Sequence, residues 1–210
     1  MFDFTMADGF IFDCDGTLLD TLNAWDEAER DLFAQAGELT QAQEDEIHAA
    51  PIEQAAAILH ERYGVGKSAE DVLAHLDNHL LPHYRDSSVP MAGALEFVCA
   101  VHDRGIPCVV VSSSPRRYLA AGLERAGVLD CFKELVSTDE VGASKQDFKI
   151  YEVAVRELGC EASRVWAVDD APYAIAVMHE FGLKTICAGP RKSDVADINV
   201  STLLELLKSE

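Results

Sequence analysis

The chain has 210 residues and a formal net charge of −20, with 37 acidic against 17 basic side chains. This length can bury a sizeable core, and one domain that carries an insertion is the expected organisation. Lys and Arg form no cluster, so a nucleic acid or an anionic membrane is not expected as a partner, because both reward clustered cations.

The first residues and the cysteines bear on where the protein works. MFDFTMADGF has neither a basic flank nor a long apolar run, so we expect no signal peptide or membrane span there and a cytoplasmic protein. The six cysteines form no CxxC pair, which favours buried free thiols over disulfides.

The first predicted element is a buried strand, the apolar run at residues 10–12, which ends at Asp13. Residues i and i+2 of an extended chain project to the same side, so Asp13 and Asp15 can face one small volume, while Cys14 between them points away. Two carboxylates held this close repel each other unless a cation or a proton lies between them. Mg²⁺ prefers such oxygen ligands. Gly16 then lets the backbone turn sharply and approach a ligand.

Between Leu19 and Ser88 the sequence changes to a helical pattern without strands. The expected helices are Thr21 to Ala36, Gln41 to Ala50, Ile52 to Tyr63 and Ala69 to Tyr84. Residues 20–87 carry 15 acidic and four basic side chains, a net charge of −11, which would repel a polyanionic substrate. We therefore expect a small leaving group with little charge of its own.

Two patterns in this region are similar to ligand sites. GVGKS, residues 64–68, lacks the first Gly and the preceding strand of a phosphate-binding loop, so we expect an inter-helix turn. His75, His79 and His83 have a spacing found in zinc sites, but they flank an apolar stripe and Pro82 is expected to disturb the helix. Half-buried histidines are the favoured interpretation and zinc the alternative.

From Pro90 onward, helical stretches alternate with short apolar runs. These runs are Cys108 to Val111, Glu134 to Ser137, Val165 to Val168 and Thr185 to Cys187. Strands spaced by helices predict a parallel sheet that is covered on both faces, and ligands bind such sheets beyond the carboxyl ends of the strands. The polar residues at those ends should therefore meet in one crevice; they are Asp13, Ser112, Asp169 and Asp170.

The segment VVVSSSPRR indicates a strand that ends at a phosphate site. Pro115 suits the first position of a helix, and the free amides of a helix start can bind phosphate. Ser114 is expected to cap that helix, which leaves Ser112, with Ser113 behind it, as the phosphate ligand. Arg116, like the arginine after it, is a candidate substrate contact, because a cation at a helix start opposes the helix dipole.

Taken together, these motifs resemble those of the haloacid dehalogenase superfamily, in the same order along the chain. DCDGT matches the DxDGT motif of that family, and Ser112 matches its second motif. KQDFKIY places Lys145 at the third motif, although both prolines and the Asp of the usual KPxPDIY are replaced, and Lys149 offers an alternative ammonium. VWAVDDA matches the acidic fourth motif through Asp169 and Asp170.

The resemblance implies an α/β fold, with a Rossmann-like parallel sheet, helices on both faces and an inserted all-helical cap of type C1. Residues 1–19 and 88–210 would form the catalytic core, and residues 20–87 would form the cap, a lid over the active site. It also implies a phosphatase that acts on a small phosphorylated metabolite through an aspartyl-phosphate intermediate.

Residue roles follow from the same resemblance. Asp13 would attack phosphorus, and Asp15 would protonate the leaving oxygen. The phosphate ligands would be Ser112, Ser113 and Lys145. Mg²⁺ would be the cofactor. Asp170 would be its main ligand, and Asp169 would bind it directly or through water. The full set of metal ligands would be Asp13, Asp15, Asp169 and Asp170.

Two alternatives to a phosphatase remain open. A sugar-phosphate mutase that resembles beta-phosphoglucomutase shares the four motifs and the cap, and differs mainly in cap residues that bind a sugar bisphosphate. The few basic residues in 20–87 favour the phosphatase. A non-catalytic phosphate-binding or interaction module is the other alternative, and the presence of the complete set Asp13, Asp15, Lys145 and Asp170 argues against it.

Overall fold

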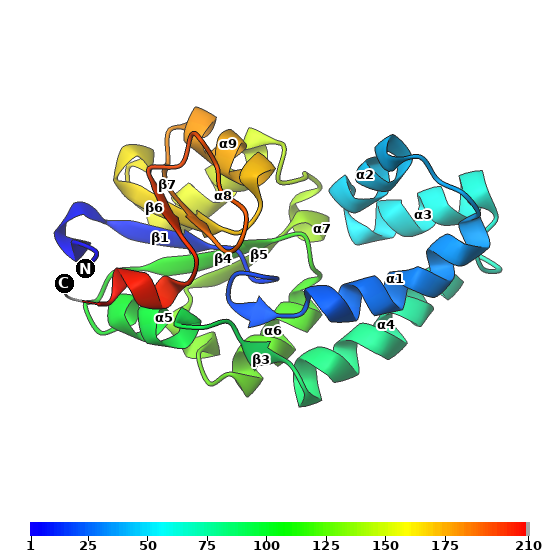
Figure 1. Cartoon of the computed structure of the whole chain (residues 1–210), viewed down its shortest axis with the longest axis horizontal. Coiled ribbons are helices and arrows are strands. Elements are labelled where there is room, and N and C mark those ends of the chain that lie inside the picture. The colour runs from blue at the N-terminus through cyan, green and yellow to red at the C-terminus, as the bar shows by residue number, and fades with distance from the viewer. Residues whose placement is uncertain (209–210) are drawn as a thin grey trace.

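A six-stranded parallel sheet lies at the centre of the molecule (Figure 1). The computed structural model describes residues 1–208 and, among these, the side chains of all but Asp45 and Ala49. The strand order is β5-β4-β1-β6-β7-β8. The strands are β1 (Gly9–Phe12), β4 (Cys108–Ser112), β5 (Glu134–Ser137), β6 (Val165–Asp169), β7 (Lys184–Ala188) and β8 (Ile198–Val200). This confirms the predicted α/β fold class; the last two residues of the predicted core, 209 and 210, lie outside the described part.

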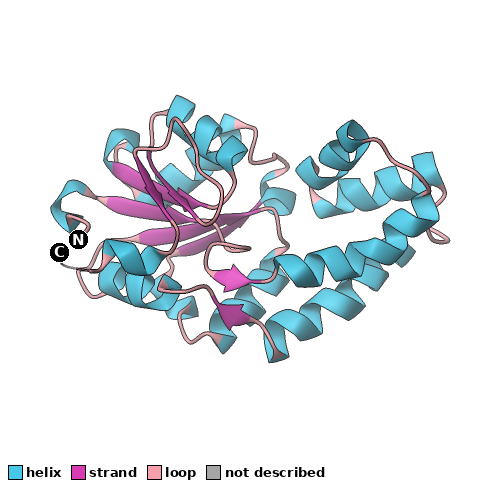
Figure 2. Cartoon of the chain, in the orientation of Figure 1, coloured by secondary structure: helices cyan, strands magenta, loops and turns pink. Residues whose placement is uncertain are grey.

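Helices cover both faces of this sheet (Figure 2), because successive side chains of a strand point to opposite sides. Phe10 and Phe12 of β1 pack in one apolar cluster with α5 and α6, whereas Ile11 packs in a second cluster with α8 and α9. The α-helices outside the insertion are α5 (Ala94–His102), α6 (Arg116–Arg125), α7 (Thr138–Val141), α8 (Phe148–Leu158) and α9 (Pro172–Phe181). Short 3₁₀ helices are η1 (Phe4–Met6), η2 (Leu129–Cys131), η3 (Ala162–Arg164) and η4 (Leu203–Leu206).

Along the sequence, a helical insertion lies between β1 and β4, the next strand of the sheet. Its helices are α1 (Leu22–Ala36), α2 (Gln41–Ala49), α3 (Ile52–Tyr63) and α4 (Ala69–Asp86). The chain enters through β2 (Leu19–Asp20) and returns through β3 (Val89–Pro90), which pair antiparallel at the foot of the insertion (Figure 1). These bounds match the predicted helices within two residues. α4 continues through Pro82, contrary to expectation; the missing N–H of Pro82 costs this 18-residue helix one backbone hydrogen bond.

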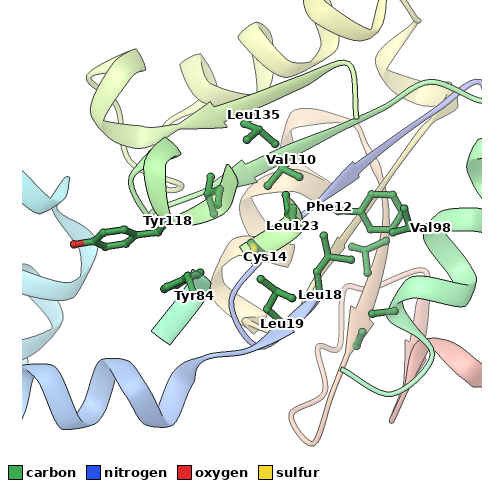
Figure 3. Close-up of a cluster of buried hydrophobic side chains, with 14 of the residues drawn as sticks. Phe12, Cys14, Leu18, Leu19, Tyr84, Val98, Val110, Tyr118, Leu123 and Leu135 are labelled. Atoms are coloured by element: carbon green, nitrogen blue, oxygen red, sulfur yellow. The ribbon is translucent and has the colours of Figure 1, made fainter. Parts of the chain in front are cut away.

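The insertion is joined to the sheet by a buried cluster (Figure 3). Tyr84 of α4 stacks on Tyr118 of α6, with ring centroids 5.4 Å apart, and both side chains are fully buried. Cys14 points into the same cluster with Leu19 and is 0% exposed. This placement confirms that Cys14 is turned away from the aspartates on either side of it.

The remaining cysteines fit the prediction only in part. All six thiols are free, and Cys14, Cys108 and Cys187 are buried. Cys99 is exposed on α5, so the expectation that the thiols are all buried is wrong there; the helical period turns that position to solvent while Val98 faces the core. Across residues 1–208, every helix is too short or too polar to cross a lipid bilayer.

Gly93 is a position where a side chain cannot be placed, and we predict a large loss of stability from Gly93→Ala. Its φ is +80°, and an added Cβ would lie 2.2 Å from the backbone nitrogen of Leu204 in η4. The variant should lower the free energy of unfolding by about 2 kcal/mol or more, measured by urea denaturation. Gly105→Ala is the matched control, since Gly105 has φ +68° and open space around it, so only the backbone conformation costs energy. Equal losses in the two variants would contradict the prediction.

Candidate active site

A cleft of about 760 Å³ lies between the carboxyl edge of the sheet and the helical insertion. Its core side is lined by residues that follow β1, β4, β6 and β7, and its opposite side by residues of α1, α2, α3 and α4. Asp13, Ser112, Asp169 and Asp170, predicted to meet at the ends of three strands, all line this cleft. The structure thus brings the predicted strand-end residues together.

Three carboxylates form the centre of the core side. Asp13 follows β1, Asp169 ends β6 and Asp170 follows it, and one carboxylate oxygen from each lies within 4.8 Å of the others. All three residues are buried. Asp169 is held in place because its Oδ1 accepts a hydrogen bond of 2.8 Å from the backbone N–H of Ala171. A group of acidic oxygens this close in a buried place fits a hard divalent cation.

Lys145 reaches into this group from the loop before α8. Its Nζ lies 2.5 Å from Asp13 Oδ1 and 2.8 Å from Asp169 Oδ2, and its side chain is only 6% exposed. Burial acts to lower the pKa of Lys145, but the two carboxylates outweigh it and hold that pKa well above its ordinary value. The alternative ammonium, Lys149, donates instead to the carbonyl of Val141 on the exposed side of the loop.

The charges at the core side of the cleft do not balance. Burial raises the pKa of Asp13 well above its usual range, although the Lys145 ammonium opposes the effect. Burial also raises the pKa of Asp170, with Asp169 adding to it and Arg191 opposing it. The acidic residues Asp13, Asp15, Asp169 and Asp170 thus face the two cations Lys145 and Arg191. With all four carboxyls ionised, the site would carry an excess of two negative charges, which one divalent cation would neutralise.

Asp15 lies beside this group but takes different partners. Its carboxylate accepts hydrogen bonds from Thr21 Oγ1 at 2.6 Å, from Ser114 Oγ at 2.7 Å and from Ser112 Oγ at 3.2 Å, and a further one from the Tyr84 hydroxyl. Asp13 and Asp15 both line the cleft. Within residues 1–208, however, Asp15 is not one of the three clustered carboxylates. The i, i+2 argument requires an extended chain, whereas β1 ends at Phe12 and the backbone then turns at Gly16, where φ is +83°.

The serines at the end of β4 and after it differ from the prediction in one respect, the residue that caps α6. Ser112 is buried, and its Oγ accepts a hydrogen bond of 2.9 Å from the backbone N–H of Ser114, while Ser113 lines the cleft. Ser114 does not cap the helix, because α6 begins at Arg116 with Pro115 at the N-cap. The cap prediction is therefore wrong by one residue. This shift frees the Ser114 hydroxyl to bind Asp15.

Arg116, the candidate substrate contact, lies outside the cleft. Its guanidinium is 2.8 Å from Glu140 and 2.6 Å from Glu134, on the side of α6 that faces β5 and α7. Arg117 is likewise occupied, at 2.6 Å from Asp77 of α4. The sequence placed both arginines near a strand end, but the rotation of the helix directs them away from the cleft.

Sequence reasoning missed several residues that complete the site. Arg191, in the loop after β7, has a guanidinium nitrogen 2.5 Å from Asp170 Oδ2. The rule that polar residues after parallel strands reach the ligand could have indicated it. Tyr84 gave no such signal, because it stands in the apolar stripe of a helix 69 positions from Asp15. Trp25 of α1 donates from its Nε1 to the Tyr84 hydroxyl at 2.8 Å, so α1 and α4 both connect to Asp15.

The histidine pattern and the GVGKS segment form no additional site. His75 Nε2 hydrogen-bonds the carbonyl of Ala28 at 3.0 Å, and His79 Nδ1 hydrogen-bonds the carbonyl of His75 at 2.8 Å. Within residues 1–208, the carboxylates at Asp13 are the only cluster of candidate metal ligands, so the three histidines do not form one. Residues 64–68 form the turn between α3 and α4, as expected.

Tyr84 positions the Asp15 carboxylate, and Tyr84→Phe is therefore expected to slow turnover. A hydrogen bond to a charged group contributes about 1.5–3 kcal/mol, so kcat for a small phosphate ester should fall by about 10- to 100-fold while KM changes little. Tyr118→Phe is the matched control, because its hydroxyl donates to Asp77 and does not contact Asp15. If steady-state phosphate-release assays give the same kcat loss for both variants, Tyr84 has no special role.

A family model described as haloacid dehalogenase-like hydrolase matches residues 7–182. Validoxylamine A 7'-phosphate phosphatase from Streptomyces hygroscopicus subsp. limoneus is 27% identical over 183 residues, which cover 85% of this chain and 83% of that protein. N-acetylmuramic acid 6-phosphate phosphatase from Pseudomonas aeruginosa is 28% identical over 179 residues, with 83% and 78% covered.

The solved structures agree with this assignment at the level of the fold. CbbY from Rhodobacter sphaeroides, in complex with phosphate, superposes with a TM-score of 0.77 at 20% identity and covers 95% of this chain and 96% of that one. The resemblance found in the motifs is thus confirmed by the family match over residues 7–182, and the fold agrees with it. The chain belongs to the haloacid dehalogenase-like hydrolases and is an enzyme of their phosphatase branch.

Proposed function

We propose that the protein is a Mg²⁺-dependent phosphomonoester hydrolase that acts on a small phosphorylated metabolite through an aspartyl-phosphate intermediate. The observation that carries this proposal is the buried arrangement of Asp13, Asp169, Asp170 and Lys145 at the sheet edge. It combines a carboxylate nucleophile, a place for a divalent cation and an ammonium group in one cleft.

In the first half of the proposed reaction, an Asp13 oxygen forms a bond to phosphorus as the ester P–O bond breaks. Lys145 offsets charge on the phosphoryl oxygens, and the hydroxyls of Ser112 and Ser113 are the remaining phosphate ligands from this chain. Asp15, which must hold a proton at the start of this step, gives that proton to the leaving oxygen, so that an alcohol departs. Mg²⁺, held by Asp13, Asp169 and Asp170 with Asp15 beside them, would supply further neutralisation of the phosphoryl charge.

In the second half, water attacks the phosphorus of the acyl phosphate. Asp15 now takes a proton from that water, and the bond between phosphorus and the Asp13 oxygen breaks. Inorganic phosphate is released, and both aspartates return to their starting states. The hydrogen bonds from Thr21, Ser114 and Tyr84 fix the direction of the Asp15 carboxylate.

We also propose that α1 to α4 act as the lid, so that residues 20–87 are a C1 cap on a core of residues 1–19 and 88–210. The position of these helices across the cleft from Asp13 supports this division. The substrate is expected to enter between the two parts. The absence of a nucleic acid or membrane partner and a cytoplasmic location remain predictions from the charge and sequence.

The decisive experiment is release of phosphate from p-nitrophenyl phosphate with and without Mg²⁺. We expect release that stops with EDTA and returns with Mg²⁺. A parallel incubation with beta-glucose 1-phosphate and its bisphosphate separates a phosphatase from a mutase, since only a mutase forms the isomeric sugar phosphate. Phosphate binding without release from any ester would instead support a non-catalytic module and contradict the proposal.

A further inference from the structure

The insertion side of the cleft has an apolar surface, here called the apolar wall: Leu22, Trp25, Leu32, Ile52, Leu59 and Leu76. Trp25 belongs to it although indole carries one polar group. That group is already satisfied, because Nε1 donates to the Tyr84 hydroxyl at 2.8 Å. Trp25 therefore presents only its apolar ring to a ligand in the cleft.

Apart from one histidine, the ionisable side chains on this side of the cleft are carboxylates. Among the cleft-lining residues that the described part of the insertion contributes, the ionisable ones are Asp26, Glu29 and His48, and none is Lys or Arg. His48 Nε2 lies 3.1 Å from Glu29 Oε2. A second anionic group on a substrate would thus meet carboxylates here rather than a guanidinium or an ammonium.

The two cations of the core side already pair with carboxylates of the acidic centre, across the cleft from the apolar wall. Lys145 is bound to Asp13 and Asp169, and Arg191 is bound to Asp170. Both contact the clustered carboxylates Asp13, Asp169 and Asp170, where the proposed reaction takes place. The cleft, at about 760 Å³, lies within the range of about 300–1,000 Å³ that is usual for ligand pockets, so space remains for a leaving group beyond the phosphate.

We infer that the substrate is a phosphate monoester whose leaving alcohol has a largely apolar body and carries no second negative charge. This inference rests on the proposed function and gives it a substrate class. The phosphate lies at the carboxylates and Lys145, and the body of the alcohol lies against the apolar wall. Bisphosphates and phosphorylated carboxylic acids are excluded from this class.

A homologous series of alkyl phosphates tests the apolar part. With ethyl, butyl and hexyl phosphate we expect kcat/KM to rise by about two- to fourfold for each added methylene, because each one is removed from water against the apolar wall. In Leu22→Asn, the rise of kcat/KM with chain length should be smaller. Leu22 is 44% exposed, so the variant should fold. A series that is flat in the wild-type protein would overturn the inference.

The second claim of the inference is that the leaving alcohol carries no negative charge. It is tested by comparing kcat/KM for hexyl phosphate with kcat/KM for 5-carboxypentyl phosphate, which has the same number of carbons. We expect hexyl phosphate to have the higher kcat/KM by about tenfold or more. Glu29→Lys should lower the ratio of kcat/KM for hexyl phosphate to kcat/KM for 5-carboxypentyl phosphate. Glu27→Lys, on the same helix but outside the cleft, should leave that ratio unchanged. Equal use of the two esters, or equal effects of the two variants, would overturn the inference.

Failure of this inference and failure of the proposed function give different results. Hydrolysis of p-nitrophenyl phosphate and ethyl phosphate, without dependence on chain length or terminal charge, would overturn the substrate class and leave the phosphatase intact. Release of phosphate from none of these esters in the presence of Mg²⁺ would overturn both.

Discussion

Replacement of Asp13 by Asn is expected to abolish phosphate release, with a loss of about 10⁴-fold or more in kcat. The amide that replaces the carboxylate is a poor nucleophile, and the covalent route is then closed. Asp13 contacts Lys145 and lies within the cluster of three carboxylates. Since it is the member of that cluster that follows β1, we expect neither of the other two to replace it. The measurement is steady-state phosphate release from p-nitrophenyl phosphate with Mg²⁺.

Two controls distinguish this effect from a loss of structure. Asp13→Asn removes one charge from a site with excess negative charge, so its urea midpoint should not fall below that of the wild-type protein. Asp15→Asn should lose kcat through the acid and base steps while it still binds substrate. Near-wild-type activity of Asp13→Asn would refute the assignment of the nucleophile.

Lys145→Met is expected to lower both activity and stability. Removing one partner of a buried ion pair leaves Asp13 and Asp169 without their ammonium, which costs about 3–5 kcal/mol in free energy of unfolding. The loss of positive charge at the phosphoryl oxygens should lower kcat/KM by at least about 10²-fold. Urea denaturation and phosphate-release assays on the same preparation measure the two effects.

Lys149→Met is the matched control for this variant. Lys149 stands four positions further along the same segment, is exposed, and donates a hydrogen bond of 2.7 Å to the carbonyl of Val141. We expect near-wild-type activity and a change in stability of about 0.5 kcal/mol or less. If Lys149→Met lost more activity than Lys145→Met, the third motif would have been assigned to the wrong lysine.

The sheet could be predicted from sequence because buried parallel strands are nearly continuous apolar runs. Val109 to Val111 and Val165 to Val168 have this pattern, and polar residues end both runs. β8 was missed, because Ile198–Val200 is a three-residue edge strand with Asn at its centre, and a run that short does not stand out.

The details of the site depended on contacts between distant segments. The environment of Asp15 is set by Thr21 and Tyr84 of the insertion, and no local pattern reveals that a tyrosine 69 residues away donates to it. The position of Arg116 depended on the rotation of α6, which a shift of one residue in its N-cap changes. Local sequence therefore located the acidic centre, whereas the orienting groups required the packed structure.

Covalent labelling of Asp13 is the most direct test of the proposed chemistry. Acid quenching during turnover, followed by borohydride reduction and peptide mass spectrometry, converts a phosphorylated aspartate to homoserine and identifies its position. We predict reduction at Asp13, only when both substrate and Mg²⁺ are present, and none in Asp13→Asn. Reduction at another carboxylate, or at none while phosphate is being released, would contradict an aspartyl-phosphate at Asp13.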